Sequence, residues 1–264
     1  MTKKPKSDYA IQAVANALRL LHVFRDDEDE VGVAELARRL ELPKNNVFRL
    51  LATMEELSFI EQCRQTGRYR LGLECYGLGQ AFKRAHPLLD RARPILDQLL
   101  EHTGEAVHLA VRDGFEVVHL AARAPVREIT VGVRTGRRAP IHCTALGKVL
   151  LGCSPERLWR EYDEQVVKRG KLPQRTQRSI DNPVKFFEHL RTVAGVGYAL
   201  DIGELEDGLG CAAAPVHDGD GELVAAISVS APLFRIGEDA LVGDLRSKVV
   251  GAAEQLSAAL GYNA

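Results

Sequence analysis

Residues 33–57 read VAELARRLELPKNNVFRLLATMEEL, and this stretch predicts two short amphipathic helices joined by a tight turn. In the first helix, Leu36, Ala37 and Leu40 recur at a spacing that puts them on one face. Pro43 follows, and proline suits the first turn of a new helix, where its missing N–H is not needed. The second helix continues the apolar spacing with Val47, Leu50, Leu51, Met54 and Leu57. This pattern is the outline of a helix-turn-helix.

The free face of the second helix carries side chains that can read DNA. Asn forms a bidentate pair with an adenine edge, and Arg does so with guanine or holds a phosphate. In helix-turn-helix proteins the N-terminal residues of the second helix reach the bases. The candidate DNA-binding residues of this helix are Lys44, Asn45, Asn46, Phe48, Arg49 and Thr53. The alternative is a helical pair of an ordinary α-rich domain whose polar residues are only solvated.

Residues 59–71, FIEQCRQTGRYRL, predict a β-hairpin directly after that helix. Apolar and polar residues alternate on both sides of a turn at residues 65–67. A hairpin in this position is a wing, and Arg64 and Arg68 are candidate phosphate contacts, which add affinity but no sequence information. Arg70 adds a third positive charge. An ordinary hairpin with a solvated basic tip is the alternative, but a helix-turn-helix followed by a wing is far less expected by chance.

A further helix, Ile11–Phe24, precedes these elements and leads into an acidic run, DDEDE, at residues 26–30. Because this run would repel DNA, we expect it on the side of the domain away from the DNA. The next helix begins at Gly32 or Val33 with a weak cap, since glycine lacks the side-chain oxygen that Ser or Thr would supply.

The composition indicates a soluble globular protein. The 264 residues leave room for about two domains. The apolar content of 45% and charged content of 27% are ordinary for this class. No apolar run approaches the ~20 residues that span a bilayer, and no signal peptide is visible, so we expect a cytoplasmic protein. Five cysteines without a C-x-x-C pair indicate reduced thiols rather than a disulfide scaffold.

The charge distribution narrows the kind of DNA binding. The net charge of −1 excludes a general polyanion binder. Residues 31–70 hold seven Lys or Arg against five Glu, which is a local charge of +2. This small positive charge favours a sequence-specific DNA binder that acts as two or more copies. It disfavours a single strongly basic module.

The sequence pattern changes at His86-Pro87, where we place a domain boundary. The sequence predicts a winged helix-turn-helix domain at 1–71, a linker helix at 72–86 and a second domain at 87–264, which the resemblance described below implies to be effector-binding. In the last of these, antiparallel strands followed by long helices indicate an α+β fold with helices packed on an antiparallel sheet. The expected elements are a helix from Pro87 to Thr103, a hairpin around Asp113-Gly114, a strand at Ile129–Val133, helices at Thr144–Leu151, Pro155–Tyr162 and Pro183–Ala194, strands at Gly197–Ile202, Leu209–Val216 and Leu223–Ser230, and a closing helix from Glu238 to Leu260.

Three segments resemble the IclR-type bacterial transcription regulators, and the resemblance covers almost the whole chain. They are LPKNNVFRLLATMEEL with the following GRYRLG, PIHCTALGKVLLG at 140–152, and GYALDIGELEDGLGCAAAPVHDGDGELVAAISVSAP at 197–232. The resemblance implies a regulator of operator DNA whose C-terminal domain has a fold similar to GAF sensor domains. The chain departs from the family at Asn45-Asn46, where Ser-Thr is common, and at Ser58, where Gly is common. The first change leaves the operator sequence open, and the second affects only turn geometry.

By resemblance, the effector lies between the sheet and the loop before the helix at 144–151. The candidate contacts are Ala145, Leu146, Asp201, Cys211, Ser228 and Ser230. The two serines are two residues apart on one strand, so both hydroxyls face the same side of the sheet. Alternation alone favours serines in solvent with Ile227 and Val229 in the core, whereas the resemblance turns the serines inward.

The candidate contacts suit a small organic acid. Buried serines need partners, and a carboxylate would supply them together with the N–H groups at the start of the helix near Ala145. No Arg or Lys is among the candidates, so we expect no ion pair to the ligand. Asp201 must then be protonated, bound to a ligand hydroxyl or turned away. We predict an acid of about two to six carbon atoms with a hydroxyl or keto group, and an aromatic acid as the second candidate.

Other chemistries receive less support. His142, Cys143, Cys211 and His217 could ligate zinc, but no short paired spacing supports a site. A cysteine hydrolase or thiol sensor with an accessory helical module is the alternative function, and it would need an orienting histidine for Cys143 or Cys211. We therefore expect no enzyme, no cofactor and no metal. By resemblance, the protein dimerises through its N-terminal domains and linker, and two dimers join through the sensor domains.

Overall fold

The computed structural model describes residues 10–24, 29–127, 131–132, 135–170 and 172–262. The chain divides into two compact units, Met1–His86 and Pro87–Ala264. Each unit has its own hydrophobic core, and each is described by itself.

The first unit is a helical bundle with a small hairpin. Its core gathers the apolar faces that the spacing predicts, with Leu20, Leu36, Val47 and Leu51 inaccessible to solvent. The hairpin strands pair antiparallel, and Ile60 and Tyr69 add their side chains to this core. The elements are α1 (Gln12–Val23), α2 (Val33–Leu40), α3 (Lys44–Glu56), β1 (Ile60–Gln62), β2 (Tyr69–Leu71) and α4 (Leu73–Ala85).

The turn between α2 and α3 depends on one left-handed residue. Glu41 has φ of 56° and caps α2, because its N–H bonds back to the carbonyls of Ala37 and Arg38. Pro43 stands one residue earlier than expected, as the N-cap of α3 rather than within its first turn. Ser58, which follows the C-cap residue Leu57 of α3, also adopts a left-handed φ of 60°, which explains why glycine suits this position.

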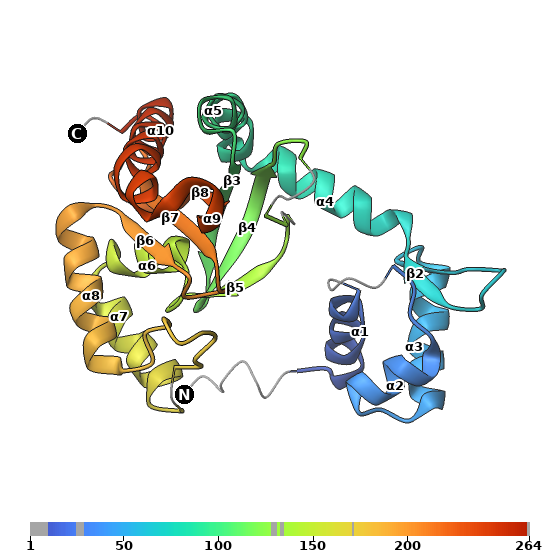
Figure 1. The fold of residues 1–264 in the computed structure, drawn as a ribbon. Coiled ribbons are helices and arrows are strands. Elements are labelled where there is room, and N and C mark those ends of the chain that lie inside the picture. Colours follow the sequence, from blue (N-terminus) through green and yellow to red (C-terminus); the bar gives the residue numbers. More distant parts are fainter. Residues whose placement is uncertain (1–9, 25–28, 128–130, 133–134, 171, 263–264) are drawn as a thin grey trace, which may run out of the picture. The chain divides into compact units, whose positions relative to one another are not determined.

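The second unit is an α+β domain, as predicted. Its six-stranded antiparallel sheet has the order β5-β4-β3-β8-β7-β6. The strands are β3 (Ala106–Asp113), β4 (Glu116–Arg123), β5 (Arg138–Pro140), β6 (Ala199–Ile202), β7 (Leu209–His217) and β8 (Leu223–Pro232). Helices α5 (Pro87–Thr103) and α10 (Arg246–Ala259) cover one face (Figure 1). Helix α6 (Ala145–Gly152) packs on the other face, where α7 (Glu156–Tyr162) and α8 (Pro183–Val196) pack against it.

A few elements of this unit differ from the prediction in detail. The closing helix predicted at Glu238–Leu260 is present: helical residues run from Glu238 in α9 (Leu233–Ala240) through the π-helical turn η3 (Leu241–Leu245) to α10, and the non-helical Gly237 precedes them. A second π-helical turn, η2 (Asp163–Val167), and strand β5 were not expected. The strand predicted at 129–133 has Ile129, Thr130 and Val133 outside the described residues.

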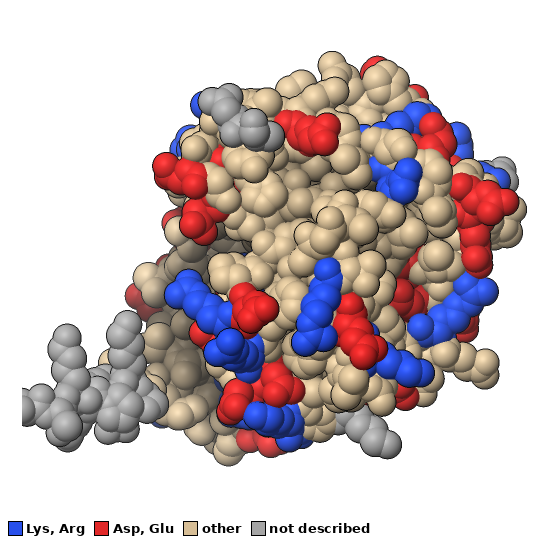
Figure 2. All heavy atoms as spheres, turned by 90° about the vertical axis from the view of Figure 1, so that its left-hand side faces the viewer, with Lys and Arg blue, Asp and Glu red and all other residues tan. Residues whose placement is uncertain are grey.

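The surface over α7 and α8 carries both charge signs. Figure 2 shows basic and acidic side chains interspersed over this face. Among the described residues drawn there, neither sign forms a continuous patch, so this face lacks the basic stripe of a nucleic-acid binder. None of the helices within the described ranges is long and apolar enough to cross a membrane.

Candidate DNA interface and ligand cavity

Helix α3 turns its apolar face inward and leaves its polar face open. Val47, Leu51 and Met54 are buried, whereas Phe48 is 57% exposed and Arg49 is exposed beside it. All eight residues predicted to contact DNA are exposed, namely Lys44, Asn45, Asn46, Phe48, Arg49, Thr53, Arg64 and Arg68. The Thr53 hydroxyl donates to the Arg49 carbonyl, so toward a partner it can only accept. The fold therefore leaves the candidate residues accessible on one element and the adjoining wing.

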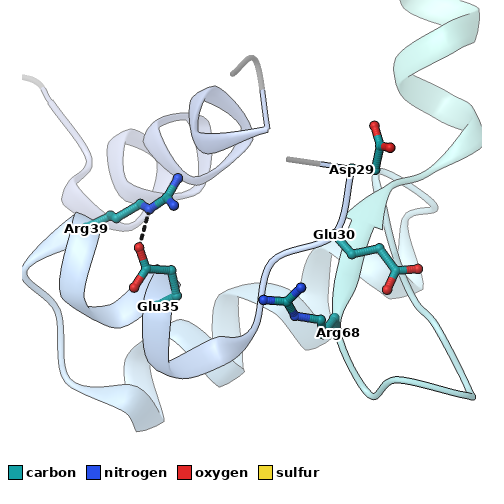
Figure 3. Close-up of a pocket in the computed structure, with 5 residues that line it drawn as sticks. All are labelled: Asp29, Glu30, Glu35, Arg39 and Arg68. Carbon is teal, nitrogen blue, oxygen red and sulfur yellow. Dashed lines mark hydrogen bonds and ion pairs between the residues drawn. The ribbon is translucent and has the colours of Figure 1, made fainter. Parts of the chain in front are cut away.

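The wing arginines differ in their surroundings. Arg70 is ion-paired with Glu61 across the hairpin. Arg68 lines a hollow with Asp29, Glu30, Glu35 and Arg39, and Figure 3 shows its guanidinium turned toward α2 rather than outward along the wing. Within the described residues Arg64 has no ion pair, so it is the wing arginine with the freest charge.

The acidic run before α2 lies closer to the wing than we expected. The Thr66 hydroxyl at the wing turn donates to the Glu30 carboxylate over 2.7 Å, and this bond is the main cause that lowers the pKa of Glu30. Val31 also forms a β-bridge with Tyr69 of β2. The expectation that the run lies away from the DNA side is therefore wrong for Glu30, because the chain after the run pairs with the hairpin. Asp26, Asp27 and Glu28 lie outside the described residues.

A cavity of about 420 Å³ lies in the second unit between the sheet and the N-terminal end of α6. It brings together all six residues predicted to contact the effector, namely Ala145, Leu146, Asp201, Cys211, Ser228 and Ser230. The sheet residues Cys211, Ser228 and Ser230 line it with small side chains, which leave this space open.

Strand register explains how these residues meet. Asp201 on β6 pairs with Cys211 on β7, which pairs with Ser230 on β8. Ser228, two residues along, pairs with His108 on β3. Both serines are therefore buried on the α6 side, at 1% and 5% exposure.

The solvent-facing interpretation of these serines is wrong. Ile227 and Val229 do face a core, but it is the core beneath α5 and α10. The alternation argument assumed that one face of the sheet meets water, whereas helices cover both faces.

The start of α6 presents two free donors to the cavity. The Thr144 side chain caps the helix by accepting the N–H of Gly147. The N–H groups of Ala145 and Leu146 donate to no acceptor in the part of the chain that the structure describes. Gly147 allows this geometry, because a Cβ there would lie 2.4 Å from the Ile141 backbone. Two unpaired N–H groups at a helix N-terminus form a favourable position for an anion.

Asp201 is the most perturbed acid of the cavity. It is inaccessible to solvent, and its Oδ1 accepts the N–H of Glu204 over 2.7 Å and that of Leu205 over 3.4 Å. Its Oδ2 is buried and has no partner among the described residues. Burial raises the pKa of this carboxyl from 3.8 to about 7, the Lys148 ammonium opposes the rise, and the Glu204 carboxylate adds to it. Asp201 therefore carries a proton for part of the time near neutral pH, and one of its oxygens is left without a partner among the described residues.

A buried ion pair lies next to this acid, and sequence reasoning missed it. Lys148 of α6 is inaccessible to solvent and donates to Glu204 over 2.5 Å. The carbonyl of Glu204 accepts the Ser179 hydroxyl, which fixes the loop after β6 to the segment before α8. A lysine at this spacing in an otherwise apolar helix is the signal that could have revealed the pair, because a buried ammonium requires a partner.

Several other cavity residues were also missed. His108 and His119 line the sheet side, and Arg137, Arg138 and Arg175 line the cavity as well. The lining therefore includes cations that are not among the predicted contacts, and the absence of an ion pair to the ligand stays a prediction. Arg138 is already bound to Asp113 and Glu116, but Arg137 and Arg175 form no ion pair with any described residue. These residues escaped notice because strand pairing and chain folding, not sequence spacing, bring them to the cavity.

The thiols of this region are poorly suited to nucleophilic chemistry. Burial raises the pKa of Cys143 to about 12 and raises that of Cys211 further, so both stay protonated at neutral pH. His142 uses its Nε2 to bind the Pro173 carbonyl. His217 lies against the Tyr262 ring. Within the described ranges no group of three or more His, Cys, Asp or Glu side chains could hold a metal ion.

A helix-turn-helix with a hairpin wing, followed by a separate α+β unit that holds a polar cavity, defines a winged-helix DNA-binding protein with a second domain. Comparison with family models gives the same result. The model "Bacterial transcriptional regulator IclR C-terminal" matches residues 80–258, and the "IclR helix-turn-helix domain" matches residues 13–64. The chain belongs to the IclR family of bacterial transcriptional regulators, as its motifs predict. It is a DNA-binding transcriptional regulator rather than an enzyme, which decides against the cysteine hydrolase alternative.

Individual relatives match over nearly the whole chain. The HTH-type transcriptional regulator KdgR of Escherichia coli is 31% identical over 100% of this chain and 97% of its own. The transcriptional repressor IclR of Escherichia coli is 30% identical over 95% and 90%. Among solved structures, an IclR regulator from Alicyclobacillus acidocaldarius has a TM-score of 0.83 at 26% identity and covers 96% of this chain and 98% of that one. An IclR homologue from Microbacterium hydrocarbonoxydans, complexed with 4-hydroxybenzoate, shares the fold with a TM-score of 0.79 at 24% identity, over 93% of this chain and 99% of that one.

Proposed function

We propose that a small organic acid binds in the cavity of the second unit and changes the affinity of the first unit for operator DNA. One observation supports this most directly. The cavity combines two unpaired N–H groups at the α6 N-terminus with the buried, unpartnered Oδ2 of Asp201. A carboxylate suits the first, and a hydroxyl or keto group suits the second.

The remaining lining agrees with an acid. Ser228 and Ser230 supply hydroxyls that can donate to a carboxylate, and Arg137 and Arg175 add positive charge to the lining. Since Asp201 is largely neutral below its raised pKa of about 7, it repels an anion less than an ordinary carboxylate would. We propose an acid of about two to six carbon atoms with a hydroxyl or keto group, and an aromatic acid as the second candidate.

Thermal-shift screening tests this proposal. Short hydroxy and keto acids, with 4-hydroxybenzoate as the aromatic candidate, should raise the melting temperature of the wild type and do so much less for Ser228→Ala/Ser230→Ala. Ser257→Ala is the matched control, because Ser257 is equally buried at 3% exposure but lies outside the cavity. Equal shifts in the wild type and the double variant, or none in the wild type, would contradict the proposed site.

We propose that α3 reads the operator bases and that the wing holds the backbone. Asn45, Asn46 and Arg49 lie exposed on the N-terminal half of α3, where such helices reach the major groove. Arg64 serves as the backbone contact of the wing, and Arg68 contributes less because carboxylates surround it. Binding to a promoter fragment is compared with binding to random DNA at moderate salt, and equal affinity would contradict the proposal. We propose a cytoplasmic location, because a DNA-binding regulator acts on chromosomal DNA.

We propose that the protein binds DNA as a homodimer joined through the first units. Exposed apolar residues recur along one face of α1 at Ile11, Val14 and Leu18, with exposures of 53 to 67%. Helix α4 buries none of its residues and exposes apolar side chains at Leu73, Tyr76, Leu78 and Phe82. Light scattering should give a dimer or a dimer of dimers, and Val14→Glu/Leu18→Glu should shift the mass toward the monomer. A wild-type monomer at working concentrations would contradict this assembly.

A further inference from the structure

The cavity has a second polar end that no sequence motif indicated. His108 of β3 lines it and is 4% exposed. In the sheet order β3-β8-β7-β6, three strand spacings separate His108 from Asp201. Neighbouring strands lie about 4.8 Å apart, so strands β3 and β6 are about 14 Å apart, and His108 lies two residues further along the sheet than Asp201. A polar group therefore stands at each end of a floor made of small side chains.

The hydrogen bonds of His108 are incomplete. Its Nδ1 lies 3.4 Å from the Ser228 hydroxyl and 3.5 Å from the Ser230 hydroxyl. Both are long for hydrogen bonds, and in each the ring nitrogen or the hydroxyl could be the donor. Its Nε2 forms no hydrogen bond with any described residue, and the ring meets His119 edge-on at a centroid distance of 5.2 Å. One ring nitrogen is thus left to be satisfied by whatever fills the cavity, and the two serine hydroxyls have only long contacts with the other ring nitrogen.

The environment keeps His108 uncharged. Burial, with a smaller contribution from the neighbouring His119, lowers its pKa to about 3. His119 is itself kept neutral by burial and by Arg137, which lower its pKa to about 4. A neutral imidazole offers one donor and one acceptor, so it pairs with a hydroxyl or carbonyl oxygen and gives no ionic preference for a second carboxylate.

We propose that His108 is a specificity-determining residue that binds a hydroxyl or carbonyl oxygen of the effector remote from its carboxylate. The inference rests on the proposed function, in which an acid occupies this cavity. A plain acid with an apolar tail displaces water from His108 without replacing its hydrogen bonds, and a buried polar group without a partner disfavours that ligand. The cavity then selects hydroxy and keto acids against plain acids of the same length.

A matched pair of acids tests the role of His108 by calorimetry. Wild type should bind 5-hydroxypentanoate about tenfold or more tightly than pentanoate. In His108→Leu the preference should fall to about threefold or less, chiefly because the hydroxy acid binds more weakly. His108→Gln should keep most of the preference, since its amide can replace the ring nitrogen. His189→Leu is the control, because His189 is another histidine with a buried ring nitrogen but lies outside the cavity.

Ring-nitrogen NMR of the wild type gives an answer that does not depend on the variants folding. Binding of 5-hydroxypentanoate should leave the His108 ring nitrogens with the shifts of a hydrogen-bonded imidazole, and binding of pentanoate should move them toward the shifts of an imidazole without a partner. An unchanged preference in His108→Leu, or equal shifts with both acids, would overturn the role of His108 while leaving the effector site intact. If neither these acids nor the other acids of the thermal-shift screen bind the wild type, the effector proposal itself is overturned, and this inference with it.

Discussion

Replacing Asp201 by Asn should change stability in a strongly pH-dependent way. Asn keeps an Oδ1 that can accept the N–H groups of Glu204 and Leu205, and it replaces the unpartnered Oδ2 with an amide. The charged groups that face Asp201 are the Lys148 ammonium on α6 and the Glu204 carboxylate in the following loop. The substitution thus removes one titration and disturbs little packing.

The sign and size of the stability change follow from the shifted pKa of Asp201. Burial raises the pKa of Asp201 from 3.8 to about 7, so the folded protein holds a proton that the unfolded chain releases. The cost to stability is absent below pH 3.8, grows as the pH rises and is complete above about 7. At 1.36 kcal/mol per pKa unit it amounts to about 2 kcal/mol at pH 5 and about 4 kcal/mol at pH 8. Asp201→Asn should therefore gain about 2 to 3 kcal/mol relative to wild type between pH 5 and pH 8.

Urea unfolding followed by tryptophan fluorescence measures this difference in the full chain. The protein has one tryptophan, Trp159, which is buried in the core of the second unit and reports on that unit alone. Asp218→Asn is the matched control, because Asp218 also accepts two backbone N–H groups but lies in a partly exposed turn. The reasoning would be refuted if Asp201→Asn changed the free energy of unfolding equally at pH 5 and pH 8, or lowered it more at pH 8. Either result would show that Lys148 keeps the carboxylate ionised.

Three further substitutions test other parts of the molecule. Arg49→Ala should weaken operator binding by about 1 to 3 kcal/mol and relax sequence preference in a mobility-shift assay, and uniform weakening on all DNA would instead indicate a phosphate contact. Ser58→Gly should stabilise the first unit by about 0.5 to 1 kcal/mol by relieving the left-handed φ of 60°, and faster hydrogen exchange in α3 would contradict this. Gly147→Ala should lower the stability of the second unit by about 1 to 3 kcal/mol and abolish acid-induced thermal shifts, because its Cβ would lie 2.4 Å from the Ile141 backbone. Gly195→Ala is its control in a helix, with no atom within 4 Å of the added Cβ, and similar losses in both variants would remove the steric explanation.

Local pattern was sufficient to predict the first unit. Its helices bury the residues that recur at helical spacing, and its hairpin follows from alternation around Gly67, which has φ of 67°. The error concerned Glu30, whose bond to Thr66 joins two segments 36 residues apart. Charge repulsion could be read from the sequence, but the β-bridge that brings Val31 to Tyr69 could not.

The candidate site shows a sharper limit. Alternation on β8 established that Ser228 and Ser230 share a face, but only the packing of helices on both faces of the sheet decides that this face is buried. His108 reaches the serines through the register of β3 and β8, at 120 residues' separation from Ser228. Sequence motifs therefore predicted only the cavity residues that lie within those motifs. His108 and the cavity arginines reach the cavity through strand pairing and chain folding, which the motifs do not encode.

The Asp201 carboxyl links the cavity to the backbone of the second unit. One oxygen holds the loop after β6 through the N–H groups of Glu204 and Leu205, while the other is left unpaired beside the cavity. Leu205 and Asp201 line the cavity themselves, and Glu204 is held by Lys148 of α6 and by Ser179 before α8. A ligand that pairs with the free oxygen therefore acts on the same carboxyl that fixes this loop. Because β6, α6 and the segment before α8 converge on that loop, a change at one oxygen reaches three elements through direct hydrogen bonds rather than through a long chain of contacts.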